Sequence, residues 1–176
     1  MVHLYRVRTL NDPDSWQLIQ EFRELTQTVS DIDWASDRKI VTASHDRSVV
    51  VWRQVGEAKW EKMLVNIDIK LSILVARWAP SARKFAMGSS CNTLAISYYN
   101  NEESCWVIAS KNNLTRAPIT TLSFHPSSNI LAIGSADFSV KIVSSSFKGS
   151  KDPFVINSKV EDYQYNGPFK NVESMF

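Results

Sequence analysis

The chain has 176 residues and a mass of 20.0 kDa; 44% of its residues are apolar and 22% are charged. This composition is typical of a folded globular protein and excludes a disordered or fibrous one. The 20 Lys and Arg residues against 18 Asp and Glu leave a net charge of +2, which is too small to hold nucleic acid or an anionic membrane by charge alone.

Neither export nor a membrane span is expected. No apolar run approaches the roughly 18 residues that cross a bilayer, and the first ten residues carry His3, Arg6 and Arg8 where a signal peptide has its apolar stretch. Cys91 and Cys105 are too few for a zinc cluster and match reduced thiols of the cytosol or nucleus.

The first expected elements are two strands that close an incomplete unit. Residues 2–5 alternate in polarity like residues 49–52, and the segment that begins at Trp16 follows them. Because similar segments recur further along the chain, we expect the chain to open inside a repeat unit, one strand from its end.

Three longer units follow, recognisable by two series of aromatic residues. The first series, with spacings of 44 and 46 residues, consists of Trp34, Trp78 and Phe124. The second series precedes the first by 18 residues each time and consists of Trp16, Trp60 and Trp106. A recurrence of this length indicates a repeat protein. We expect the first series to pack in the core and the second to lie on the last strand of the preceding unit.

Each unit alternates with a period of two, which predicts strands rather than helices. One strand is expected at residues 40–44, 85–89 and 131–135, and apolar pairs at 49 and 51, 94 and 96, and 140 and 142 predict the next. Between them, Asp46 and Asp137 are placed to accept a backbone N–H two residues on and stabilise a tight turn. Cys91 takes this place in the middle unit, which we expect to be looser.

Four short strands per 44 to 46 residues match the period of a WD40 propeller blade. The sequence therefore predicts an all-β fold: a partial WD40-type β-propeller with about three four-stranded antiparallel blades plus part of a first blade. The expected divisions are residues 1–28 (end of the first blade), 29–67 and 68–111 (two blades), 112–146 (a blade without a clear outer strand) and 147–176 (a linker towards a missing blade). The alternative is a β-sandwich with evenly spaced aromatic residues.

More specific segments accompany the repeat. They are residues 31–35 (DIDWA), 76–80 (ARWAP) with 84–89 (KFAMGS), 124–126 (FHP) with 131–138 (LAIGSADF), 106–107 (WV), 167–169 (GPF) and 175–176 (MF). Together, over about residues 2–176, they resemble the family of the WD40 subunit, subunit 1, of the actin-related protein 2/3 complex.

The resemblance implies a non-catalytic, seven-bladed propeller in an assembly that nucleates a daughter actin filament on the side of a mother filament. The implied partners are the other subunits of that complex, the actin filament and nucleation-promoting factors, and the implied location is the cytoplasm and cytoskeleton. The chain corresponds to less than half of such a subunit, so we expect a truncated form without the later blades.

The candidate partner-binding residues lie in loops, because a propeller presents loops from every blade on one rigid surface. They are Arg47 and Phe138, each one position after a turn aspartate, and Lys70 and Arg116, which precede the inner strands. Arg can hold a carboxylate with two parallel hydrogen bonds, so we expect an acidic partner segment. The alternative for each is a side chain that keeps a loop in water.

No enzyme is predicted, and we expect neither a cofactor nor a metal. The three histidines lie in different units, and the sequence lacks a nucleophile motif, a convergent acid pair, metal-ligand spacing and a Gly-rich phosphate loop. Two functions stay open: an interaction subunit of the actin-nucleating complex, and a general WD40 adaptor that binds peptides or proteins without an actin role. Because a closed propeller needs at least four blades, we also expect the isolated chain to self-associate or to be unstable.

Overall fold

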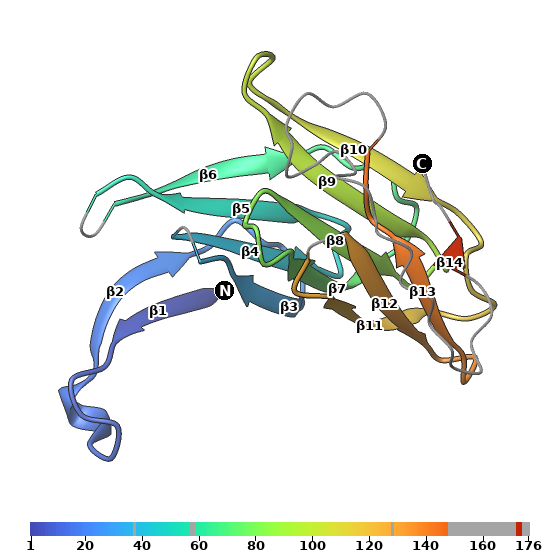
Figure 1. Ribbon diagram of the computed structural model, residues 1–176. Coiled ribbons are helices and arrows are strands. Elements are labelled where there is room, and N and C mark those ends of the chain that lie inside the picture. The colour runs from blue at the N-terminus through green and yellow to red at the C-terminus, as the bar shows by residue number, and fades with distance from the viewer. Residues whose placement is uncertain (37, 57–58, 128, 148–171, 174–176) are drawn as a thin grey trace.

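The computed structural model describes residues 1–36, 38–56, 59–127, 129–147 and 172–173. Within these residues the regular structure consists of strands apart from one short 3-10 turn, η1 (Pro13–Ser15), and the strands form four sheets (Figure 1). No helix in this part of the chain is long and apolar enough to cross a membrane. The predicted all-β fold is confirmed.

The first three sheets are antiparallel throughout. The first contains β1 (Val2–Arg6) and β2 (Gln17–Phe22). The second contains, in spatial order, β3 (Val29–Trp34), β4 (Lys39–Ser44), β5 (Val49–Gln54) and β6 (Trp60–Val65). The third contains β7 (Ile73–Trp78), β8 (Lys84–Ser89), β9 (Leu94–Asn100) and β10 (Cys105–Lys111). Both full sheets therefore have the predicted four-stranded antiparallel order.

The fourth sheet departs from this pattern at its last strand. It contains β11 (Ile119–Phe124), β12 (Ile130–Ser135), β13 (Val140–Ser144) and β14 (Val172–Glu173). The pair of β13 and β14 is parallel, so the expectation of wholly antiparallel blades is wrong here. A parallel pair needs a long crossover, and the chain between β13 and β14 is long enough for one. Most of the predicted linker, residues 148–171 and 174–176, lies outside the described residues.

Consecutive sheets stack through their first strands, with β3 against β7 and β7 against β11. Two carboxylates of β3 hold the first of these contacts. Asp31 Oδ2 accepts a hydrogen bond from the backbone N–H of Ala76 at 2.9 Å and pairs with Arg77, and Asp33 Oδ2 accepts one from the N–H of Trp78 at 2.7 Å. Because β7 is an edge strand of its own sheet, these carboxylates satisfy N–H groups that no strand pairs with.

Three apolar cores fill the spaces between the four sheets. Each core joins residues of two neighbouring sheets: Phe22 with Trp52 in the first, Val51 with Phe85 in the second, and Ile96 with Leu131 in the third, to give one example from each sheet. Since a strand between two cores is covered on both faces, the middle strands are apolar at nearly every position, as in β5.

Of the aromatic series expected in the core, Trp78 is 7% exposed and Phe124 is half-buried, whereas Trp34 is 57% exposed. The expectation is therefore wrong for Trp34. Trp34 and Trp78 end equivalent strands, and each ring contacts a tryptophan of its own fourth strand, Trp60 and Trp106 respectively. The difference lies in the preceding sheet, which has four strands in front of Trp78 and only two described strands in front of Trp34.

One lysine lies inside the molecule. Lys84, the first residue of β8, is completely buried, and its Nζ donates a hydrogen bond to the carbonyl of Ser145 at 2.7 Å. This bond ties the third sheet to the segment that follows β13. Burial disfavours the charged ammonium and lowers the pKa of Lys84 to about 8.

Candidate partner-binding surfaces

The turns between the second and third strands carry two of the predicted site residues, Arg47 and Phe138. In the second sheet Asp46 Oδ1 accepts a hydrogen bond from the backbone N–H of Ser48 at 2.9 Å, and in the fourth sheet Asp137 Oδ1 accepts one from Ser139 at 3.0 Å. This confirms that each aspartate stabilises a tight turn two residues long.

The same carboxylates reach the loop that precedes the first strand of their own sheet. Asp46 Oδ2 accepts hydrogen bonds from the N–H and hydroxyl of Thr26 at 2.7 and 2.8 Å, and Asp137 Oδ2 accepts one from the N–H of Arg116 at 2.8 Å. Each aspartate therefore connects its own turn to the loop before the first strand of its sheet. In the fourth sheet this loop contains the predicted site residue Arg116.

These hydrogen bonds favour the ionised carboxylates. Burial raises the pKa of Asp46, but hydrogen bonds from Ser48 and Thr26 outweigh it and lower that pKa well below its usual range. For Asp137, the hydrogen bond from the Ser139 side chain is the largest cause of a similarly lowered pKa, followed by the Arg116 backbone. Both turns are therefore held by charged acceptors at neutral pH.

The backbone at the predicted positions is left-handed. Arg47 has φ 71° and Phe138 φ 64°, and Asn92 has φ 61° at the equivalent place in the third sheet. An L-residue other than Asn or Asp rarely adopts this conformation. The turn therefore pushes the side chains of Arg47 and Phe138 to the outside, and Phe138 is fully exposed.

A chain of hydrogen bonds joins these turns and loops from sheet to sheet. Ser72 donates its hydroxyl to the carbonyl of His45 at 3.2 Å, which connects the second sheet to the loop before β7. The N–H of Leu114 donates to the carbonyl of Asn92 at 3.1 Å, which connects the third sheet to the loop before β11. We call this end of the sheets the loop end; it comprises residues 26–28, 45–48, 66–72, 90–93, 112–118 and 136–139.

All four predicted site residues lie at the loop end, and all four are exposed: Arg47, Lys70, Arg116 and Phe138. The structure brings Arg116 and Phe138 into adjacent loops through Asp137. Arg47 and Lys70 belong to neighbouring loops that the bond between Ser72 and His45 connects. The loop end thus presents three cations and one large aromatic ring to the outside.

The middle turn of the loop end is built without an aspartate. The hydroxyl oxygen of Ser89 accepts hydrogen bonds from the N–H groups of Cys91 at 3.3 Å and Thr93 at 3.2 Å, and so takes over the role of the carboxylate. Burial raises the pKa of Cys91, but hydrogen bonds from Ser89, Thr93 and the Leu71 backbone lower it overall. A neutral acceptor replaces a charged one here, and the expectation of a looser middle unit stays a prediction.

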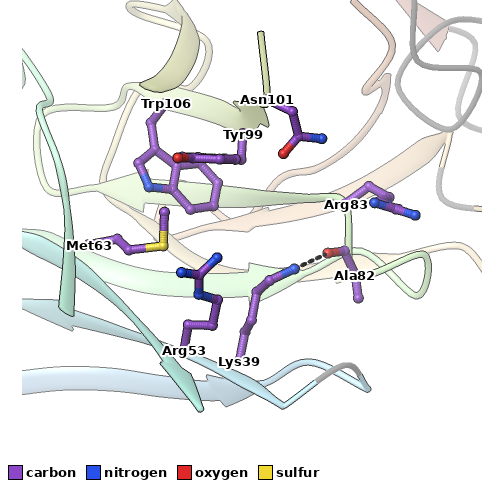
Figure 2. Close-up of a pocket in the computed structure, with 8 residues that line it drawn as sticks. All are labelled: Lys39, Arg53, Met63, Ala82, Arg83, Tyr99, Asn101 and Trp106. Carbon is purple, nitrogen blue, oxygen red and sulfur yellow. Dashed lines mark hydrogen bonds between the residues drawn. The ribbon is translucent and has the colours of Figure 1, made fainter. Parts of the chain in front are cut away.

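A pocket of about 120 Å³ lies at the opposite end of the sheets, between the second and third sheets (Figure 2). It was not predicted from the sequence. Its walls are lined by Lys39, Arg53, Met63, Ala82, Arg83, Tyr99, Asn101 and Trp106. We call it the inter-sheet pocket.

The inter-sheet pocket has the rings of Tyr99 and Trp106 on one side and the cations Arg53 and Lys39 on the other (Figure 2). Lys39 Nζ lies 3.5 Å from the carbonyl of Ala82 and 5.8 Å from the centre of the Trp78 ring. Arg53 pairs with Glu61 at 3.3 Å, and the Trp106 ring meets Tyr99 edge to face with 5.3 Å between the ring centres. The pocket therefore combines an apolar floor with a positively charged rim.

The sequence contains one signal for this pocket. The 18-residue spacing places Trp106 on the fourth strand of its sheet, and the structure has it there, in β10. Lys39 and Arg53, however, belong to another sheet, and only the stacking of the sheets shows that they face Trp106. Nothing in the local pattern around Arg83 distinguishes it from an ordinary loop residue.

The described residues contain no cluster of His, Cys, Asp and Glu that could hold a metal ion. Both cysteines are free in this part of the chain, Cys91 half-buried and Cys105 exposed. What the loop end and the inter-sheet pocket share is exposed positive charge next to aromatic rings, which suits binding.

Comparison with known proteins agrees with this geometry. The pattern of the WD domain, G-beta repeat, matches residues 16–53 and 104–144, two segments that contain the aspartate turns of the second and fourth sheets. The chain contains WD40 repeats. Residues 54–103 lie between the two matches and include β7, β8 and β9 of the third sheet, which repeats the same strand order with Cys91 in place of the turn aspartate. The predicted partial WD40-type propeller is confirmed.

Similar proteins carry one name in several organisms. The chain is 35% identical over 149 residues to actin-related protein 2/3 complex subunit 1A of Arabidopsis thaliana. The aligned residues make up 84% of this chain and 38% of that protein. The chain is 32% identical to subunit 1A-B of Xenopus laevis (87% and 43%) and 30% identical to subunit 1 of Saccharomyces cerevisiae (83% and 37%). The predicted resemblance is confirmed, and the chain spans about two fifths of the length of these relatives.

Proposed function

We propose that this WD40 chain is a non-catalytic interaction subunit of an assembly like the actin-related protein 2/3 complex. In this role it contributes to actin filament nucleation and branching by docking other subunits and nucleation-promoting factors, in the cytoplasm and at the cytoskeleton. The observation that carries the proposal is the 35% identity to a subunit of that complex over 84% of the chain.

The loop end supports the proposal as the docking surface. Its loops are held by hydrogen bonds within and between the sheets, so the loop backbone needs little ordering when a partner binds. Arg47, Lys70 and Arg116 supply cations that suit carboxylates, and Phe138 supplies an aromatic anchor that is fully exposed. We therefore assign these four residues to contact with an acidic segment of a partner.

The proposal is tested by co-purification. The tagged 176-residue chain is recovered from a cell extract at near-physiological salt, and the bound proteins are identified by mass spectrometry. We expect the other subunits of the actin-related protein 2/3 complex. The double charge reversal R47E/R116E should reduce their recovery at least several-fold, because a rim charge that turns repulsive weakens association.

Lys59 offers a matched control, because it is an exposed cation between β5 and β6, at the end of the sheet opposite the loop end. K59E should leave the recovery unchanged. Absence of the complex from the wild-type sample would contradict the proposal. Partners from a ubiquitin ligase or a chromatin complex in its place would favour the general WD40 adaptor.

A further inference from the structure

The charged groups that line the inter-sheet pocket are all cations. Lys39 and Arg53 extend into it from the second sheet, and Arg83 comes from the turn between β7 and β8 of the third sheet (Figure 2). No carboxylate lines the pocket within the described residues; Glu61, which pairs with Arg53, lies outside the lining. A cavity of this kind attracts a ligand that supplies negative charge and acceptors.

One donor of the pocket is buried and unused. Nε1 of Trp106 has no hydrogen-bond partner among the described residues, although water does not reach it. Figure 2 shows this nitrogen on the side of the indole ring that faces Met63, within the ring of lining residues. A buried N–H without an acceptor costs free energy. Because water does not reach this nitrogen, a ligand in the pocket packs against the Trp106 ring and does not accept a hydrogen bond from it.

The volume of the inter-sheet pocket and the charge of its lining limit the class of ligand that fits. A volume of about 120 Å³ equals that of about four water molecules in the liquid, which is room for a small polyatomic group. The cations reach the pocket from two different sheets, so a ligand with oxygens in several directions can meet more of them than a planar carboxylate can. A phosphate group has three terminal oxygens and close to two negative charges at neutral pH.

We propose that the inter-sheet pocket binds a phosphate group. Arg53 and Arg83 hold its oxygens from opposite sheets, Lys39 adds a third positive charge, and the ring of Trp106 forms one wall of the site. The phosphate group is either free inorganic phosphate or part of a phosphorylated side chain. Bound there, it bridges the second and third sheets and stabilises their packing. This site is separate from the loop end.

The test uses the full 176-residue chain with inorganic phosphate, O-phosphoserine and aspartate, in calorimetric titrations and thermal melts at one ionic strength. We expect saturable binding and a raised melting temperature with the two phosphate compounds, and neither with aspartate. Tighter binding of O-phosphoserine than of phosphate assigns the site to a phosphorylated side chain; equal binding assigns it to free phosphate.

Two substitutions separate this site from general attraction to a cationic protein. R83Q removes an exposed cation from the pocket rim and should weaken phosphate binding about tenfold. R116Q, at the loop end, is the matched control and should bind like the wild type.

Four results would overturn the proposal. Three of them are the absence of saturable phosphate binding by the wild-type chain, binding of aspartate as tight as that of phosphate, and wild-type phosphate affinity in R83Q; a fourth concerns the control R116Q. The second result would make the pocket a carboxylate site for an acidic peptide. A loss of affinity in R116Q as large as that in R83Q would show unspecific charge attraction and would equally contradict the assignment.

Discussion

Among single residues, the turn aspartates have the clearest role. Asp46 accepts hydrogen bonds from the backbone of Ser48 and from Thr26, and so holds a turn and a neighbouring loop at once. We expect D46A to lower the free energy of unfolding by about 1 kcal/mol, the usual cost of a lost side-chain cap of backbone N–H groups. Urea denaturation of the two proteins measures this difference.

Arg47 provides the control for this substitution. It is the next residue, it is exposed, and both Arg and Ala carry a Cβ at its left-handed backbone conformation. R47A should therefore change the free energy of unfolding by less than about 0.5 kcal/mol. A loss in D46A no larger than that in R47A would show that the carboxylate does not hold the turn.

Lys84 links stability to pH. Its pKa of about 8 in the folded chain lies below the ordinary 10.5, so the unfolded chain binds the proton more tightly between these two values. The burial of a charged group opposes folding below pH 8, and this penalty is relieved as the pH rises. We expect the free energy of unfolding of the wild type, relative to K84M, to increase between about pH 8 and pH 10.5. A constant difference over that range would contradict a lowered pKa.

At the scale of strands and sheets, the recurrence of aromatic and small residues predicts the second and third sheets closely. The fourth strand expected at Trp60 runs over Trp60–Val65, and the turn aspartates accept the backbone donors expected of them. The sequence could not predict β14 or its parallel pairing with β13. A strand of two residues is too short to show a recognisable polarity pattern. The sequence also could not predict that Trp34 is exposed, because exposure depends on the neighbouring sheet.

Two equivalent glycines test how tightly the sheets stack. A Cβ at Gly88 would lie 2.4 Å from Ile119 Cγ2 of the next sheet and 2.8 Å from Val75 Cγ1. A Cβ at Gly134 would meet only Thr121 Cγ2, at 2.5 Å, within its own sheet. Since Thr121 is exposed and can rotate, whereas Ile119 is fully buried, the two substitutions should differ.

We expect G88A to lower the free energy of unfolding by about 1–3 kcal/mol through overpacking, and G134A to lower it by clearly less. Thermal or urea denaturation of both variants gives the comparison. Equal losses in the two variants would mean that the third and fourth sheets do not pack as described.

Across the whole molecule, equivalent apolar faces of the sheets are buried in one sheet and exposed in another. The apolar residues at 49, 51, 94 and 96 are completely buried between sheets, whereas Val140, at the equivalent place in the fourth sheet, is 52% exposed. Trp34 is exposed at the other end of the stack. Open apolar faces of this kind favour association.

We therefore expect the isolated 176-residue chain to self-associate. Analytical ultracentrifugation over a range of concentrations should show an average mass that rises above 20.0 kDa. Substitution of a charged residue for the exposed apolar one, V140E, should reduce the association, whereas V55E, at an exposed valine that follows β5, should not. A sharp monomeric species with a cooperative melt at all concentrations would contradict this expectation.

The two candidate surfaces differ in how far the sequence could predict them. The four loop-end residues follow from the repeat, because the turn and the preceding loop recur at fixed positions in each unit. The inter-sheet pocket does not, since Arg53 and Trp106 are distant in the sequence and belong to different sheets. Only the stacking of whole sheets creates the pocket, so the one signal in the sequence is the spacing that places Trp106 on the fourth strand.

The most direct test of the stacked arrangement is a nuclear Overhauser measurement on the methyl-labelled chain. Gly88 belongs to the third sheet and Ile119 to the fourth. In the structure the α-carbon of Gly88 faces the γ2 methyl group of Ile119. A strong cross-peak between the α-protons of Gly88 and this methyl group is the predicted result. Its absence in a folded sample, with the cross-peaks within each sheet intact, would contradict the packing of successive WD40 sheets on which both proposed surfaces depend.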